Sequence, residues 1–331
     1  MYLKDLFTPP KIKDKPEIQK KDYKRDTVYL YQYGRLKNCP NLSPFCMKIE
    51  VLCRIYKIPY EIVECTTMRS RNGLLPFIEL NGDHISDSDL IEMRLKSHFK
   101  IPTLSGDLET QSVALSKMTF FHLFHIIYRF KTSEHAFYET IYRLVGMPQA
   151  LKFLFLPFVK ASVGKRFYAR NTGAIGDFEL KELDEFLHKD LEIIQNTMKG
   201  KFLFGDKITA ADATVFSLLA TVYYPFHTHV SDVLEKDFPK ILEYIKRARE
   251  PAIDVHPPLP RQHLLLEPAH LTMLIRALPV PHGLQMDSAP TPSTLWLRER
   301  PIVPELAEYV ENLVGDKTRP VDDHDSQNIA F

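Results

Sequence analysis

The helical periodicity of the chain's second part constrains the fold more than any other feature. From Leu108 to about residue 250, apolar residues recur at helical spacing almost without interruption. The expected helices span residues 108–131, 134–146, 149–168, 177–198, 210–224 and 238–250. No run in this part alternates as a half-buried strand does, so the sequence predicts an all-helical domain over residues 107–250.

The first hundred residues follow another pattern, in which strands and helices alternate. Strands are indicated by β-branched and aromatic residues, helices by capping residues before apolar spacing, and a hairpin by an Asn-Gly turn. The expected order is a strand at residues 27–31, a helix from Ser43-Pro44, a strand at residues 60–63, a hairpin at residues 74–85 and a helix from Asp87-Ser88. We therefore expect a small α/β domain over residues 27–100.

Charge and proline content separate the two ends of the chain. With 43 Lys and Arg against 42 Asp and Glu, the net charge of +1 gives no reason to expect binding to nucleic acid. Residues 251–331 hold 12 of the 24 prolines and a net charge of −5, whereas the first 250 residues carry +6. This composition predicts a Pro-rich, largely disordered tail at residues 251–331. Residues 1–26 are expected to form an N-terminal extension.

Cysteine usage and hydropathy point to the cytoplasm. The four cysteines, at positions 39, 46, 53 and 65, show neither a disulfide framework nor paired metal spacing. Residues 1–26 lack the apolar segment of a secretory signal. The longest uncharged stretch, residues 213–231, contains a proline and several polar residues and reads as a buried helix. We expect a cytoplasmic protein without an integral membrane segment.

A capping box precedes the most apolar helix. In the run from Lys201 to Asp212, Thr209 and Asp212 have the spacing at which a hydroxyl and a carboxylate satisfy the first N–H groups of a helix. The pattern predicts a structural role for both side chains.

This Phe-Gly-Asp lead into a Thr-x-x-Asp box resembles the C-terminal domain of glutathione transferases, and residues 27–100 resemble their thioredoxin-like N-terminal domain. Three segments, Leu42–Cys46, Gly73–Gly82 and Ser86–Ile91, resemble the failed axon connections family, including its cadmium-responsive members. The likeness covers roughly residues 26–250. It implies an α/β plus all-α protein, a two-domain layout that metaxins share.

The resemblance implies a glutathione site. Ser43 matches the residue that contacts the glutathione sulfur, where a hydroxyl and the helix dipole can stabilise a thiolate. Pro76 matches a cis-proline, and the preceding Leu75 would offer its backbone groups to the cysteinyl part. Asp87 and Ser88 match the pair that holds the γ-glutamyl amine and carboxylate. Plain helix capping explains Ser43, Asp87 and Ser88 equally well.

Other candidates near this site are weaker. Cys46 stands in the second cysteine position of a glutaredoxin-like pattern whose first cysteine is missing, and it is more readily explained as a small buried hydrophobe. Arg69 and Arg71 could meet the glycyl carboxylate, although solvated charges are commoner. Tyr29 and Tyr31 are less well placed than the serine.

Two patterns fall on the first long helix of the helical domain. An aromatic run could wall an apolar pocket for a second substrate, although such stripes usually pack in a core: Phe120, Phe121, Phe124, Tyr128 and Phe130. His122 and His125 have i, i+3 spacing, but no cysteine pair accompanies them, and we expect no metal site.

Three functions fit these observations. The first is a transferase or peroxidase with glutathione as co-substrate and a small apolar electrophile, acting in metal or xenobiotic stress. The second is a non-catalytic interaction protein of the axon-development type. The third is a metaxin-like mitochondrial import component, which the charges and prolines within Leu264–Val280 disfavour because they interrupt any anchor. The first is preferred, and a homodimer is an alternative to the monomer because many relatives dimerise.

Overall fold

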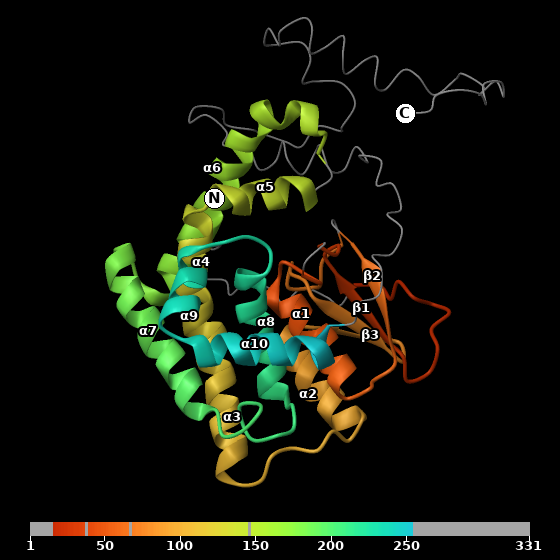
Figure 1. Ribbon diagram of the computed structural model, residues 1–331. Helices are drawn as coiled ribbons and strands as arrows, with labels where there is room; N and C mark the ends of the chain where they lie inside the picture. Colours follow the sequence, from red (N-terminus) through yellow and green to blue (C-terminus); the bar gives the residue numbers. More distant parts are fainter. Residues whose placement is uncertain (1–15, 37–38, 66–67, 145–146, 254–331) are drawn as a thin grey trace, which may run out of the picture. The chain divides into compact units, whose positions relative to one another are not determined.

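The computed structural model describes residues 16–36, 39–65, 68–144 and 147–253, which all fall within one compact unit (Figure 1). The predicted tail at residues 254–331 and the first 15 residues of the predicted extension lie outside the described residues.

A four-stranded mixed sheet forms the N-terminal part. Its strands are β1 (Val28–Gln32), β2 (Tyr60–Glu64), β3 (Phe77–Leu80) and β4 (Asp83–Ser86), in the spatial order β2-β1-β3-β4. β1 pairs with β2 in parallel and with β3 antiparallel, and β4 returns antiparallel to β3. Two helices accompany the sheet, α1 (Pro44–Ile55) between the parallel strands and α2 (Ser88–His98) after β4. This is the thioredoxin-like arrangement that the sequence predicts.

The predicted Asn-Gly hairpin is confirmed. Asn81 and Gly82 have φ values of 51° and 82°, so both turn residues adopt the left-handed backbone that a two-residue turn of this kind needs. Asparagine tolerates this conformation, and glycine adopts it without a steric cost. The turn sets the register in which Leu80 pairs with Asp83.

The segment before β1 crosses the outer face of the sheet. The buried carboxylate of Glu79 on β3 accepts hydrogen bonds from the backbone N–H groups of Gln19 and Lys20, at 2.8 and 2.9 Å. The hydroxyl of Tyr29 on β1 accepts another from the N–H of Lys24, at 2.9 Å. Residues 68–76, between β2 and β3, contain no helix. The N-terminal segment therefore covers part of the face that carries these two side chains.

The rest of the described chain is helical. The helices are α3 (Asp107–Met118), the π-helix η2 (Thr119–Leu123), α4 (Phe124–Ser133), α5 (His135–Leu144), the 3-10 helix η3 (Gln149–Leu151), α6 (Lys152–Ile175), α7 (Leu180–Thr197), α8 (Ala210–Tyr223), α9 (His229–Lys236) and α10 (Pro239–Ala252). We find among the described residues no helix with the length and apolar character that a membrane crossing needs.

Two helices differ from the prediction. α6 continues past residue 168 to Ile175, through polar residues that carry little apolar pattern but include the buried Asn171. α9 was not predicted, because its eight residues are too few for periodicity to show. Thr228 and Ser231 nevertheless form a capping box at its start.

α8 is the central helix of the helical domain. Every residue from Ala210 to Val222 is buried, and the helix packs against α1, α3 and α10 (Figure 1). Its start is fixed by the predicted capping box. The fully buried Asp212 carboxylate accepts from the N–H groups of Thr209, at 2.7 Å, and Leu203, at 3.1 Å. The structural role predicted for this pair is confirmed.

Asp212→Ala should lower the free energy of unfolding by about 3 kcal/mol, because the cap is lost and two buried N–H groups lose their acceptor. Urea denaturation followed by circular dichroism measures this. The control is Asp206→Ala in the same loop, whose exposed carboxylate accepts one hydrogen bond from the N–H of Lys201, with an expected loss of under about 1 kcal/mol. Equal losses in both variants would contradict the assigned role.

Candidate functional site

One edge of the sheet gathers the predicted site residues. Phe77, the first residue of β3, pairs with Tyr31 near the end of β1 and with Ser86 at the end of β4. Leu75-Pro76 comes just before this point and Asp87-Ser88 just after it. Continuing the antiparallel register by one residue places Pro76 beside Asp87. The end of β1, the approach to β3 and the start of α2 therefore meet at the same edge.

Ser43 stands at the start of α1, on the connection that leaves β1. Its backbone is extended, its hydroxyl accepts a hydrogen bond from the N–H of Cys46 at 3.4 Å, and Pro44 follows as the first helical residue. Buried Asn41 fixes this position, because its side chain donates to the carbonyl of Tyr33 at 2.8 Å and accepts from the N–H of Ser43 at 3.0 Å.

Sequence reasoning missed Asn41 and Tyr33. An asparagine two residues before a capping serine is a common turn signal, and this signal could have identified Asn41. Tyr33 lies two residues after Tyr31, just beyond the end of β1, and its place at the site depends on the path of the turn-like stretch that follows this strand.

The Leu75-Pro76 peptide bond is cis, as predicted. The Leu75 side chain is buried in a small cluster with Cys46 of α1, Tyr31 and Phe77, which joins the site's helix to its strands. The Leu75 backbone N–H and C=O form no hydrogen bond with any described residue. These two groups are therefore available to an extended peptide ligand.

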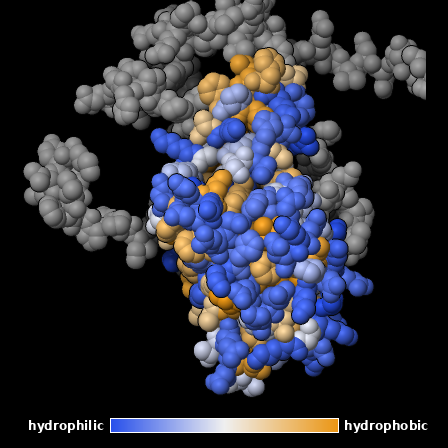
Figure 2. Space-filling view, turned by 60° about the vertical axis from the view of Figure 1, so that its left-hand side comes forward, coloured by the Kyte–Doolittle hydropathy of each residue, from blue (hydrophilic) through white to orange (hydrophobic). Residues whose placement is uncertain are grey.

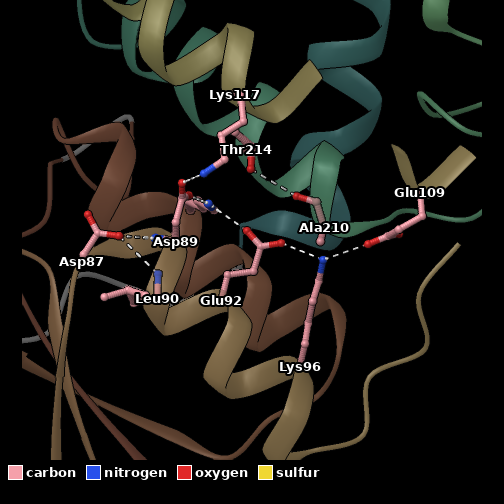
Figure 3. A network of polar contacts seen from close by, with 10 residues as sticks. Asp87, Asp89, Leu90, Glu92, Lys96, Glu109, Lys117, Ala210 and Thr214 are labelled. Carbon is pink, nitrogen blue, oxygen red and sulfur yellow. Dashed lines mark hydrogen bonds and ion pairs between the residues drawn. The ribbon is translucent and has the colours of Figure 1, made fainter. Parts of the chain in front are cut away.

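Asp87 caps α2. Its φ of 78° is unusual for a residue other than glycine, and its Oδ1 accepts from the N–H groups of Asp89, at 2.9 Å, and Leu90, at 3.2 Å (Figure 3). Asp87 is thus a helix cap. Both hydrogen bonds go to Oδ1, and the Oδ2 atom of this exposed residue contacts no hydrogen-bond donor among the described residues. Ser88 is the buried first residue of the helix.

Two guanidinium groups approach this edge from different parts of the chain. Arg69 lies 5.5 Å from the centre of the Tyr33 ring, and Arg170 of α6 lies 5.9 Å from the Phe45 ring of α1. Burial raises the pKa of Tyr33, and the two cations act against that rise. Both cations therefore act on the part of the site around Tyr33. Arg71 makes no comparable contact with a described residue.

The competing nucleophiles are occupied or buried. Cys46 is fully buried, and burial raises the pKa of its thiol to about 12 although the nearby Ser43 side chain acts against that rise, so it remains a thiol at neutral pH. The Tyr31 hydroxyl donates to Glu79 at 2.9 Å. The Tyr29 hydroxyl already accepts a hydrogen bond from the segment before β1.

The aromatic run of η2 and α4 is mostly core, as expected: Phe120, Phe124, Tyr128 and Phe130 are buried, whereas Phe121 is exposed. Phe45, two residues after Ser43, packs its ring 4.6 Å from the Phe120 ring. His122 contacts Asp190 of α7 and His125 contacts Asn171 of α6, so the two histidines have separate partners. No group of three metal-ligating side chains occurs among the described residues.

A buried lysine holds the start of α2 in place. The Lys48 side chain is 1% exposed, and its Nζ lies 2.7 Å from Asp89 and 2.8 Å from Glu92. Lys117 also pairs with Asp89, and Lys96 with Glu92. Burial favours the neutral carboxyl groups, but the lysines outweigh it and the pKa values of Asp89 and Glu92 lie below their usual range. This network ties α1, α2 and α3 together beneath the site.

Lys48→Met should lower the free energy of unfolding at pH 7 by about 3 kcal/mol, because two partly buried carboxylates lose their shared cation. A lowered carboxyl pKa stabilises the fold above the unfolded value, near about 4, and this contribution is lost as the pH falls through the folded value. The difference between the variant and the wild type should therefore shrink below about pH 4. Urea denaturation at several pH values measures it.

Lys189→Met is the matched control for this experiment. Lys189 pairs with Glu192 at 3.1 Å, but both side chains are mostly exposed, so the expected loss is under about 1 kcal/mol. A Lys48→Met effect that is equally large at pH 3 and pH 7 would show that packing, and not charge, explains the loss.

Comparison with known proteins identifies relatives of both domains. A family model described as the glutathione S-transferase N-terminal domain matches residues 44–137, and one described as the glutathione S-transferase C-terminal domain matches residues 187–248. The protein Failed axon connections of Drosophila melanogaster is 30% identical over 251 residues, which is 70% of this chain and 60% of that protein. The chain thus matches less than two thirds of that relative's length.

Two further similarities are more distant. The isoprene-epoxide glutathione S-transferase of Rhodococcus sp. (strain AD45) is 23% identical over 243 residues, 67% of this chain and 98% of that protein. A crystal structure of a glutathione S-transferase from Rhodospirillum rubrum F11 aligns with a TM-score of 0.45 and 20% identity, over 71% of this chain and 97% of that one.

Proposed function

The chain is a glutathione S-transferase-fold protein related to Failed axon connections, and from this premise we propose that it binds glutathione at the sheet edge beside Ser43. The observation that carries the proposal is the cis Leu75-Pro76 bond next to the start of α2, where the Leu75 backbone groups pair with none of the described residues. An extended tripeptide can pair with these groups as a further strand would.

The surrounding charges fit the two ends of glutathione. A γ-glutamyl carboxylate would lie at the N-terminus of α2, where N–H groups and the Ser88 hydroxyl favour an anion. The unused Oδ2 of Asp87 can accept from the γ-glutamyl amine. Arg69, whose guanidinium group lies over the Tyr33 ring, would meet the glycyl carboxylate.

Ser43 would stabilise the glutathione thiolate. Its hydroxyl accepts one hydrogen bond from Cys46 and keeps its proton for a ligand sulfur, and the start of α1 adds a positive field. The thiol proton leaves to water, and the sulfur then forms a bond to an electrophilic carbon as a leaving group departs or an epoxide C–O bond breaks. The relationship to an isoprene-epoxide transferase supports a small apolar electrophile.

This reaction suits a detoxification role in a reducing compartment such as the cytoplasm. The four cysteines are all free and buried, so nothing in the described residues depends on an oxidised thiol.

A non-catalytic interaction protein is the second candidate. Ser43 and Asp87 each cap a helix, and this structural role alone would explain both residues in a protein that catalyses no reaction. The relationship to Failed axon connections supports this alternative. The two candidates differ in whether bound glutathione turns over.

Asp87→Asn should weaken glutathione binding by about 10-fold to 100-fold, because the amide keeps the cap but loses the charged hydrogen bond to the amine. Isothermal titration calorimetry with the full chain measures this. Asp83→Asn on β4, whose exposed carboxylate contacts only Arg94 among the described residues, is the matched control and should leave binding unchanged.

Ser43→Ala should reduce turnover of an epoxide by about 10²-fold to 10³-fold while binding changes little, because one donor to the developing thiolate is lost. Ser43→Thr keeps both a hydroxyl and a cap and should retain most activity. Binding without any turnover in the wild type would favour the interaction protein. No binding by folded wild-type protein would disprove the glutathione site itself.

A further inference from the structure

The hairpin of α5 and α6 concentrates the positive charge of the chain. Residues 135–175 contain six Lys and Arg side chains and one carboxylate, so they carry +5 in a chain whose total is +1. The single carboxylate, Glu139, pairs with Lys152 and Arg143 and is 25% exposed. The remaining cations have no acidic neighbour within the hairpin.

α6 itself has five basic residues and no acidic residue: Lys152, Lys160, Lys165, Arg166 and Arg170. Its exposed surface also carries large aromatic side chains. Phe153 is 80% exposed, more than any other large apolar side chain among the described residues, and Phe158 and Tyr168 are each 46% exposed. In Figure 2, apolar side chains gather at the top of the coloured surface, and hydrophilic side chains lie next to them.

The exposed residues share one side of the helix. Phe153, Pro157, Ala161, Lys165 and Tyr168 are all exposed and follow one another by three or four positions, which keeps them on one side of the helix. The exposed Phe158 and Lys160 lie at the two sides of this row. With a rise of about 1.5 Å per residue, this face is about 22 Å long. We call it the α6 face. Tyr168 is the last residue of this face. Its hydroxyl donates to Asp177, which also pairs with Arg129.

We propose that the α6 face binds an anionic lipid surface. Lysines beside exposed phenylalanines on one helix are the composition of helices that lie in the headgroup region, with aromatic side chains in the acyl boundary and cations at lipid phosphates. The absence of carboxylates on α6 removes the repulsion that would oppose such a surface. Nucleic acid would offer phosphates to the lysines but no apolar phase to Phe153 and Phe158.

The lipid surface and the proposed glutathione site are separate. The face begins at the N-terminal turn of α6, whereas Arg170, near the last turn, is the α6 residue whose cation lies over Phe45. We leave Arg170 out of the face for this reason. Lipid binding therefore does not rest on glutathione binding.

Vesicle flotation with the full chain tests the proposal. The protein should bind vesicles of phosphatidylcholine with about 30% phosphatidylserine, should not bind phosphatidylcholine alone, and should be released by added salt through screening. Lys160→Gln and Lys165→Gln should each weaken binding about fivefold. Phe153→Ser with Phe158→Ser should abolish stable binding.

Control variants change similar residues elsewhere. Phe121→Ser removes an exposed phenylalanine of η2 that is 64% exposed, and Lys189→Gln removes an exposed lysine of α7. Both should bind as the wild type does. Circular dichroism confirms that each variant is folded.

Three results would overturn the proposal. The first is no binding to anionic vesicles by the folded wild type. The second is equal binding to neutral vesicles, which would remove the role of charge. The third is anionic binding that the α6 variants leave unchanged, which would assign the lipid contact to another surface.

Discussion

The burial of α1 between the sheet and α8 is the constraint on which the rest of the structure depends. Every residue from Cys46 to Cys53 is buried, because one side of the helix faces β1 and the other faces α8. Two of these residues, Lys48 and Glu50, are charged, and an unpaired charge in this position would be costly. Lys48 is satisfied by the carboxylates of α2, and Glu50 by Gln32 and Arg35. The same packing thus sets the position of α1, of α2 and of the sheet edge between them.

The features that could be predicted from the sequence are those that depend on interactions between residues close together in the chain. The Asn-Gly turn, the Thr209 and Asp212 capping box and the order of strands and helices each depend on residues close in sequence, and each is found. The cis bond before Pro76 followed from a family resemblance. The burial of Lys48 and Glu50 could not be predicted, because both look like solvent-facing residues until α2 meets Lys48 on one side of α1 and β1 meets Glu50 on another. Likewise, nothing near Glu79 indicates that backbone groups some 60 residues earlier will bind its carboxylate.

The candidate site shows why the role of a polar residue at a helix start is hard to predict from sequence. Capping and anion binding use the same unsatisfied N–H groups, so a residue selected for one is also suited to the other. The structure shows which atoms the capping bonds use. At Asp87 both capping bonds go to Oδ1, while at Ser43 the hydroxyl oxygen accepts and its hydrogen stays available. Asn41, which positions Ser43 from a distance of two residues, belongs to neither pattern and was found only from the fold.

Most of the charge on α6 has no carboxylate partner within the described residues, since only Lys152 pairs with one, Glu139. Arg166 and Arg170 stand four residues apart, a spacing at which like charges repel and weaken a helix by about 0.2–0.5 kcal/mol. An exposed phenylalanine ring buries little apolar surface and so adds little to the stability of the fold. Phe153 could be replaced by a polar residue without loss of packing. α7 of the same domain differs, because it carries five carboxylates and two lysines. The combination of cations and exposed aromatic rings on α6 is better explained by a partner that binds both together. An anionic lipid surface meets both requirements at once.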